Sequence, residues 1–85
     1  MIEFTHKIDD KEGLHARPVS KVVEHAKKFD SGITLAVGER SASASELMDV
    51  LALDACYGET LTVRVAGPDE KKAAKDMKKV LKDVL

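Results

Sequence analysis

Several features that would assign a function directly are missing from this 85-residue chain. Its only cysteine, Cys56, cannot form an intramolecular disulfide, and we expect it to be a small, partly buried residue near the end of a helix. The sequence has neither a signal peptide nor an apolar run of membrane-spanning length, which favours the reducing cytoplasm and no membrane insertion. The formal net charge is -1, so there is no basic excess for binding nucleic acid. We therefore expect its partners to be proteins.

Motifs of the common catalytic centres are absent too. The chain contains no glycine-rich nucleotide loop, no Ser-His-Asp arrangement and no paired-carboxylate centre. A chain of this length can build one thin hydrophobic core, and no repeat, linker or low-complexity tract divides it. We therefore expect a single domain over residues 1–85 and a monomer without a cofactor.

Hydrophobic periodicity predicts an α+β fold. Alternating apolar residues predict strands over 2–8, 33–37, 40–43 and 61–65, with the small residues of 40–43 favouring a sheet edge. Helical spacing predicts one helix from the residues after His15 to Phe29 and another after Asp69, and a short helix is favoured for Leu47 to Leu53. Because each helix has one apolar face and no connection suits an all-parallel sheet, we expect an antiparallel sheet covered by helices on one side.

The segment Gly13-Leu14-His15-Ala16-Arg17-Pro18 carries the main functional signal. Pro18 falls in the first turn of the first predicted helix, where its missing N–H costs nothing. A helix start offers unpaired amides and the positive end of the helix dipole, so His15 lies where an anion is favoured. A phosphoryl group on the nucleophilic imidazole would meet Arg17 and those amides, which suggests a phosphohistidine carrier. The alternative is a solvated helix cap without chemistry.

In its context this segment resembles the HPr family, the histidine-containing phosphocarriers of the bacterial phosphoenolpyruvate-dependent phosphotransferase system. The resemblance runs from Phe4 to the C-terminus and includes Ser41-Ala42-Ser43-Ala44, Leu47-Met48 and the turn at Gly67. It implies an open-faced β-sandwich, in which a four-stranded antiparallel sheet is covered on one face by three helices in the order βαββαβα.

The resemblance also implies a mechanism. The donor would be phosphorylated enzyme I, and the acceptor a histidine of IIA proteins in sugar uptake or its regulation. His15 would accept the phosphoryl group on Nδ1, while Arg17 and the amides of Ala16 and Arg17 would stabilise its oxygens. The chain would then be a stoichiometric carrier rather than an enzyme, and the scheme requires no metal.

Family members present their active histidine within an apolar docking patch. The matching positions here are Ala16, Ser20, Leu47, Met48 and Leu51. For Leu47 and Leu51 ordinary helix packing is an equal alternative. Met48 is the better interface candidate, because its flexible thioether can adapt to several partners.

Position 46 departs from a pattern found in many Gram-positive members, which carry a serine that a kinase phosphorylates there. This chain has Glu46, preceded by Ser45, so regulation by phosphorylation at this place is in doubt. Ser43 to Glu46 matches a helix capping box, the interpretation that we favour. Alternatively, Glu46 supplies a permanent negative charge where phosphoserine would lie. Glu24 and Asp49, at positions that are often basic in the family, suggest a preference for different IIA proteins.

Two further histidines and two other functions complete the predictions. We expect His6 and His25 to be structural and not to chelate a metal with His15. A regulatory module that acts only by binding proteins is one alternative function, and an α+β domain with an unrelated ligand is another. The carrier hypothesis fails if the His15 imidazole is buried or turned away from Arg17.

Overall fold

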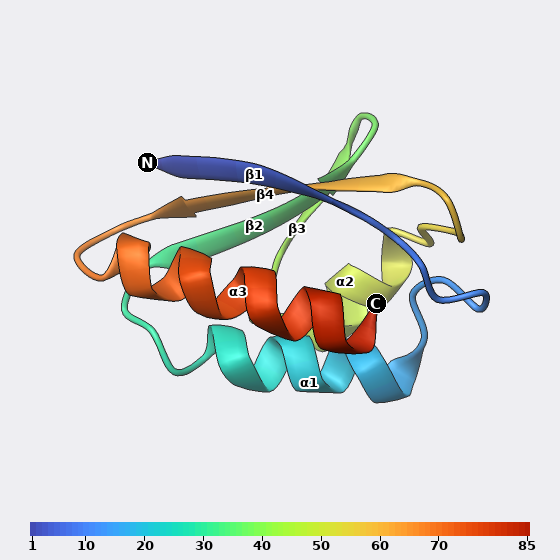
Figure 1. Ribbon diagram of the computed structural model, residues 1–85, viewed down its shortest axis with the longest axis horizontal. Coiled ribbons are helices and arrows are strands. Elements are labelled where there is room, and N and C mark those ends of the chain that lie inside the picture. The colour runs from blue at the N-terminus through green and yellow to red at the C-terminus, as the bar shows by residue number, and fades with distance from the viewer.

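The computed structural model describes residues 1–85, which form four strands and three helices in the predicted order βαββαβα (Figure 1). The elements are β1 (Ile2–Lys7), α1 (Ala16–Ala26), β2 (Gly32–Val37), β3 (Arg40–Ser43), α2 (Leu47–Ala52), β4 (Thr60–Ala66) and α3 (Glu70–Val84). None of the helices combines the length and the apolar character needed to cross a membrane.

The four strands form one antiparallel sheet with the order β1-β4-β2-β3. The register places Leu35 of β2 between Val63 of β4 and Ala42 of β3. β3 lies at an edge of the sheet, as its small residues predict. The hairpin between β2 and β3 turns at Gly38, whose positive φ of 58° suits a residue without a side chain.

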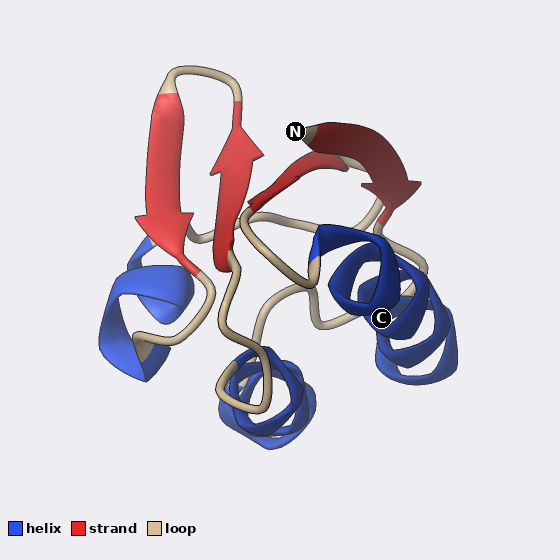
Figure 2. Ribbon diagram, turned by 90° about the vertical axis from the view of Figure 1, so that its left-hand side faces the viewer, coloured by secondary structure: helices blue, strands red, loops and turns tan.

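The sheet and the helices form two layers (Figure 2). All three helices lie against one face of the sheet, and the other face remains open. The predicted α+β class and the open-faced sandwich are therefore confirmed. One face of each strand and one stripe of each helix are apolar, so this two-layer packing buries both against each other.

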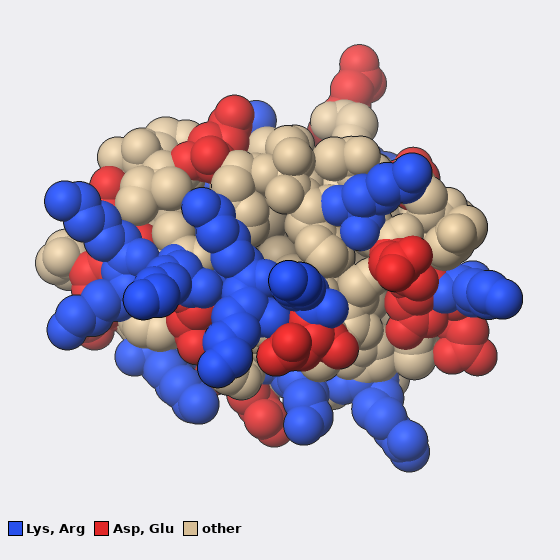
Figure 3. All heavy atoms as spheres, viewed as in Figure 1, with Lys and Arg blue, Asp and Glu red and all other residues tan.

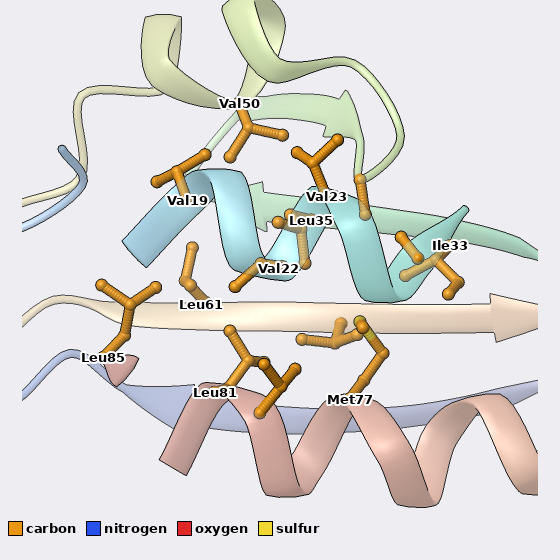
Figure 4. Close-up of a cluster of buried hydrophobic side chains, with 14 of the residues drawn as sticks. Val19, Val22, Val23, Ile33, Leu35, Val50, Leu61, Met77, Leu81 and Leu85 are labelled. Carbon is orange, nitrogen blue, oxygen red and sulfur yellow. The ribbon is translucent and has the colours of Figure 1, made fainter. Parts of the chain in front are cut away.

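The core fills the space between the layers (Figure 4). Val19 and Val22 of α1 and Leu81 of α3 are almost completely buried against Leu35 and Leu61 of the sheet. Val50 of α2 completes the cluster from the side of β3. Burial of a side chain of this size contributes about 1.5–3 kcal/mol, so these contacts fix α1 relative to the sheet.

The first helix is shorter than its hydrophobic pattern predicts. α1 ends at Ala26, whereas the apolar spacing continues to Phe29. Beyond Ala26 the backbone amides donate to the carbonyl three residues earlier, from Lys28 N to His25 O and from Phe29 N to Ala26 O, as in a 3₁₀ turn. Phe29 still packs against the core from this tightened turn, so the apolar spacing persists after the helix has ended.

Candidate functional site

His15 is the residue at which the loop after β1 becomes helix α1. Its backbone is extended, with φ -137° and ψ 168°, and α1 begins at Ala16. Pro18 lies in the first turn, as predicted. No side chain caps this helix start, so the amides of Ala16 and Arg17 have no partner within the protein. These amides and the helix dipole can stabilise an anion beside the His15 ring.

The loop that precedes α1 is held by distant parts of the chain. Gly13 has a φ of 67°, and a Cβ at this position would collide with the carbonyl oxygen of Ala55. The amide of Leu14 donates to the same carbonyl at 3.0 Å, and the amide of Asp9 donates to the backbone oxygen of Leu85. These contacts fix the loop, and with it the position of His15.

The His15 imidazole is accessible, and its two nitrogens differ. Its side chain is 34% exposed. Burial of the imidazole, which would have refuted the carrier hypothesis, is therefore not observed. Nε2 lies 3.0 Å from Oδ2 of Asp10 and 3.4 Å from Oε2 of Glu12. Nδ1 makes no hydrogen bond within the protein. The ring therefore presents one nitrogen that is free to act as a nucleophile.

Asp10 is the main partner of His15. The hydrogen bond from His15 and the one from the Glu12 amide hold the pKa of Asp10 below its ordinary value. The carboxylate of Asp10 thus remains ionised down to lower pH than a free aspartate. Neither Asp10 nor Glu12 is among the site residues predicted from the sequence. Two acidic residues shortly before a histidine, in a turn closed by glycine, are the signal that could have found them.

Arg17 and His15 face the same open cavity, which has a volume of about 260 Å³. Its lining consists of Asp10, His15, Arg17, Pro18, Lys21 and Val84. Arg17 is exposed and forms no ion pair with a carboxylate. Many other cations lie on the exposed face of α3, over the left and centre of Figure 3, but Arg17 and Lys21 are the two that line this cavity. Arg17 is thus free to pair with an incoming anion.

The predicted docking residues lie near the start of α1 and along α2. Ala16 is exposed, and Met48 is 74% exposed. Leu47 and Leu51 are half-buried and pack partly against the core, so both alternatives for these residues hold in part. Ser20 is half-buried, and its hydroxyl donates to the carbonyl oxygen of Ala16 at 2.7 Å. Because α1 and α2 pack against each other, these residues can contribute to one surface.

The capping-box interpretation of Ser43 to Glu46 is wrong. Ser43 is the last residue of β3 and pairs with Thr34, so it cannot be the N-cap of α2. The N-cap is Glu46 itself, and its side chain makes no capping hydrogen bond. The hydroxyls of Ser43 and Ser45 lie 2.9 Å apart and bond to each other. Glu46 is exposed at the start of α2, where its charge faces solvent.

Three further residues, His25, His6 and Cys56, were predicted to have structural roles. His25 packs against α3, with its Nδ1 2.7 Å from Oδ2 of Asp76. His6 lies on the helix-facing side of β1, and its Nε2 is buried without a hydrogen-bond partner. Neither histidine joins His15 in a ligand cluster. The expectation for Cys56 is wrong on burial, because α2 ends early and leaves Cys56 in an exposed loop.

One cluster could hold a cation. The ligand atoms of Asp10, Glu12 and His15 lie within 4.8 Å of one another. Exposed carboxylates often gather in this way without an ion, and here both approach the same ring nitrogen. That the site uses no metal stays a prediction.

Comparison with known proteins assigns the family. A family model described as the phosphorylation site of the PTS HPr component matches residues 2–83. The chain belongs to the HPr family. It is 35% identical over 83 residues to the phosphocarrier protein HPr of Mycoplasma capricolum, which covers 98% of this chain and 93% of the relative. HPr proteins are the phosphocarriers of the phosphotransferase system, as the resemblance predicted.

Solved structures agree with this assignment. A histidine-containing phosphocarrier protein from Mycoplasma superposes with a TM-score of 0.94 at 34% identity, over 96% of this chain and 93% of that one. An HPr dimer from Thermoanaerobacter tengcongensis superposes with a TM-score of 0.77 at 31% identity, over 98% and 95% of the two chains. A similar HPr has thus been solved as a dimer, and the monomer stays a prediction for this chain.

Proposed function

We propose that this HPr-family protein accepts a phosphoryl group on His15 from a phosphohistidine of enzyme I and passes it to a histidine of a IIA protein. The observation that carries the proposal is the accessible His15 ring, whose unbonded Nδ1 lies at an open helix start beside a cavity shared with Arg17. The protein would be a stoichiometric carrier in the cytoplasm, serving sugar uptake or its regulation.

The transfer balances without any proton leaving the His15 ring. The lone pair of Nδ1 attacks the phosphorus, and the bond between phosphorus and the donor's histidine nitrogen breaks with its electron pair returning to the donor. Phosphoryl transfer of this kind asks mainly for positioning and charge stabilisation, because the transferring group is only loosely bonded at the transition state. In the second transfer the IIA histidine attacks the phosphorus, and the bond from His15 Nδ1 to phosphorus breaks with its electron pair returning to Nδ1.

Arg17 and the open helix start supply the charge stabilisation. The guanidinium is always cationic and can pair with two phosphoryl oxygens, while the amides of Ala16 and Arg17 donate from the start of α1. Each hydrogen bond to a charged group contributes about 1.5–3 kcal/mol. Stabilisation cannot be much greater, because a carrier must release its cargo to the next protein.

The partner surface we propose lies at the start of α1, next to His15, and along α2. It consists of Ala16, Ser20, Leu47, Met48 and Leu51, with Met48 as its most exposed apolar side chain. An exposed methionine can adapt to both a donor and several acceptors, which a carrier meets in turn.

Incubation with enzyme I, Mg²⁺ and labelled phosphoenolpyruvate tests the proposal. We expect one acid-labile, base-stable label on the wild type and none on His15→Ala. A His25→Ala variant is the matched control, and it should be labelled like the wild type. If the folded wild type takes up no label, the carrier function is refuted and the regulatory module becomes the better interpretation.

Glu46 is proposed to weaken docking to acidic partners, because its charge stands where the family's regulatory serine would be. Its exposed position at the start of α2 and the absence of a capping bond support this over a structural role. Glu24 and Asp49 are exposed too and would add to the effect. Glu46→Ser should raise the rate of phosphotransfer from enzyme I. An unchanged rate in Glu46→Ser would remove the idea, and Glu39→Ser, in the hairpin between β2 and β3, is the matched control.

A further inference from the structure

The carboxylate of Asp10 faces the nitrogen of His15 that the proposed reaction does not use. Asp10 Oδ2 lies 3.0 Å from Nε2. An ionised carboxylate only accepts hydrogen bonds, so a neutral ring that bonds to it must carry its proton on Nε2. We propose that Asp10 is a positioning residue that keeps this proton on Nε2 and leaves Nδ1 as the phosphoryl-accepting atom. The role in transfer rests on the proposed carrier function, whereas the role in setting the ring state does not.

Asp10 is well suited to this role because it is itself fixed. Its second oxygen, Oδ1, accepts the backbone amide of Glu12 at 2.9 Å. Its carbonyl accepts the amide of Gly13 at 2.9 Å, within the turn that leads to His15. Both carboxylate oxygens are therefore used, and rotation of the carboxylate would break two bonds at once. The lowered pKa of Asp10 keeps it an acceptor wherever the imidazole is neutral.

Glu12 carries the same charge but lacks this geometry. Its side chain is 76% exposed, and its Oε2 lies 3.4 Å from Nε2, beyond the range of a good hydrogen bond. No backbone amide of the protein donates to its carboxylate. Glu12 is thus a matched control for the charge of Asp10 without its hydrogen bonds.

The hydrogen bond should also strengthen during the reaction. When Nδ1 forms its bond to phosphorus, a ring that keeps a proton on Nε2 becomes positively charged. Asp10 then faces a cation instead of a neutral N–H, and charge-assisted bonds are the stronger kind. Both carboxylates also repel the incoming phosphoryl oxygens, so loss of either charge should by itself favour transfer. Loss of this repulsion therefore cannot explain a slower rate in an Asp10 variant.

Two substitutions separate tautomer control from mere packing. Asparagine at position 10 has one side-chain oxygen, and the Glu12 amide can keep it, which turns the NH₂ group toward Nε2. Nε2 must then accept, the ring proton moves to Nδ1, and the nucleophile is blocked. Alanine leaves the ring free to adopt either tautomer. The predicted order of transfer rates is wild type, then Asp10→Ala, then Asp10→Asn.

The experiment combines two measurements on the wild type, Asp10→Asn, Asp10→Ala and Glu12→Gln. Nitrogen-15 NMR of the His15 ring at about pH 8.5, where an unperturbed imidazole is neutral, reports which nitrogen bears the proton. Single-turnover transfer from phosphorylated enzyme I reports the rate. We expect the proton on Nε2 in the wild type and Glu12→Gln, and on Nδ1 in Asp10→Asn. The rate should fall about tenfold or more in Asp10→Asn, because the wrong tautomer blocks the nucleophile, and only a few-fold in Asp10→Ala. Glu12→Gln should equal or exceed the wild type.

The outcomes are separable from those for the proposed function. An unchanged tautomer and an unchanged rate in Asp10→Asn would overturn the inference, as would a greater loss in Asp10→Ala than in Asp10→Asn. The NMR measurement needs no donor, so it decides whether Asp10 sets the ring state even if the wild type accepts no phosphoryl group. That last result would refute the carrier function instead.

Discussion

Helix α1 carries a histidine–aspartate pair at each end, and the two pairs share a similar exposure of the ring but differ in the bonded nitrogen and in the origin of the aspartate. His15 bonds through Nε2 to Asp10, five residues away, at 3.0 Å. His25 bonds through Nδ1 to Asp76 of α3, 51 residues away, at 2.7 Å. Both rings are about one-third exposed, at 34% and 31%.

The two pairs lie at opposite ends of the helix dipole. His15 precedes the first turn, where free amides and the positive end of the dipole favour an anion. His25 lies in the last turn, where carbonyl oxygens and the negative end favour a cation. A protonated His25 next to Asp76 would join two helices, whereas a phosphoryl group there would meet the wrong end of the dipole. The helix dipole therefore favours a phosphoryl group at His15 over one at His25.

The largest effect is expected from Gly13→Ala, which should disrupt the first pair and spare the second. The added Cβ would collide with the Ala55 carbonyl, and the positive φ is unfavourable for alanine. We expect a loss of about 2–4 kcal/mol in the free energy of unfolding, measured by denaturant titration. Phosphorylation of His15 should fall with it, since the loop must move.

Gly38→Ala is the matched control for this change. Gly38 also has a positive φ, but no atom lies within 4 Å of the place that a Cβ would take, so only the backbone cost of about 1 kcal/mol remains. Equal losses in the two variants would show that Ala55 does not constrain the loop.

Removal of Arg17 should slow phosphoryl transfer to His15 at the start of α1 without affecting the His25–Asp76 pair at its end. Arg17→Ala should slow transfer from phosphorylated enzyme I by about 10- to 150-fold, the equivalent of one charge-assisted hydrogen bond. Folding should be unaffected, because Arg17 is exposed and makes no ion pair. The rate is measured in single turnover, with Lys72→Ala on α3 as a charge-matched control. Equal rates for Arg17→Ala and the wild type would contradict the role of the guanidinium.

The second pair should matter for stability alone. Asp76→Asn replaces a charged partner of His25 by a neutral one, and we expect a loss of about 0.5–1 kcal/mol for this partly exposed pair. Thermal and denaturant unfolding measure the loss, while the rate of His15 phosphorylation should stay at the wild-type value. A slower rate with intact folding would mean that the two ends of α1 are coupled.

The smallest effect concerns proton binding by Asp10. His15 is the main cause of the lowered pKa of Asp10, so His15→Ala should raise that pKa toward its ordinary value. The stabilisation from the lowered pKa is present above the ordinary pKa and is lost as the pH falls through the folded-state value. His15→Ala should therefore reduce stability near neutral pH, and the difference from the wild type should vanish in acid. Carbon-13 NMR titration of the carboxyl groups checks the shift, and His25→Ala should leave Asp10 unchanged.

Periodicity predicted most of the fold. The apolar alternation of β2 and β4 and the stripe of α3 are dictated by burial on one face, which spacing reports directly. The helix start at His15 was also predictable, because Pro18 and the apolar residues that follow locate the first turn. His15 and Arg17 were thereby placed together correctly.

Features that depend on backbone direction could not be predicted in this way. Asp10 meets His15 across a turn in which Gly13 has a positive φ, and hydrophobic periodicity does not report such a backbone reversal. Ser43 and Glu46 have capping-box spacing, yet pairing of Ser43 with Thr34 across the sheet takes precedence over the local signal. Cys56 is exposed because α2 ends at Ala52, and the length of so short a helix is set by tertiary packing.

The bonds from Asp9 to Leu85 and from Leu14 to Ala55 have a consequence for newly made protein. The loop that bears His15 receives these anchors from residues synthesised long after it, so we expect a nascent or truncated chain to lack the proposed acceptor geometry. The phosphotransferase system would then charge only fully folded copies of this protein.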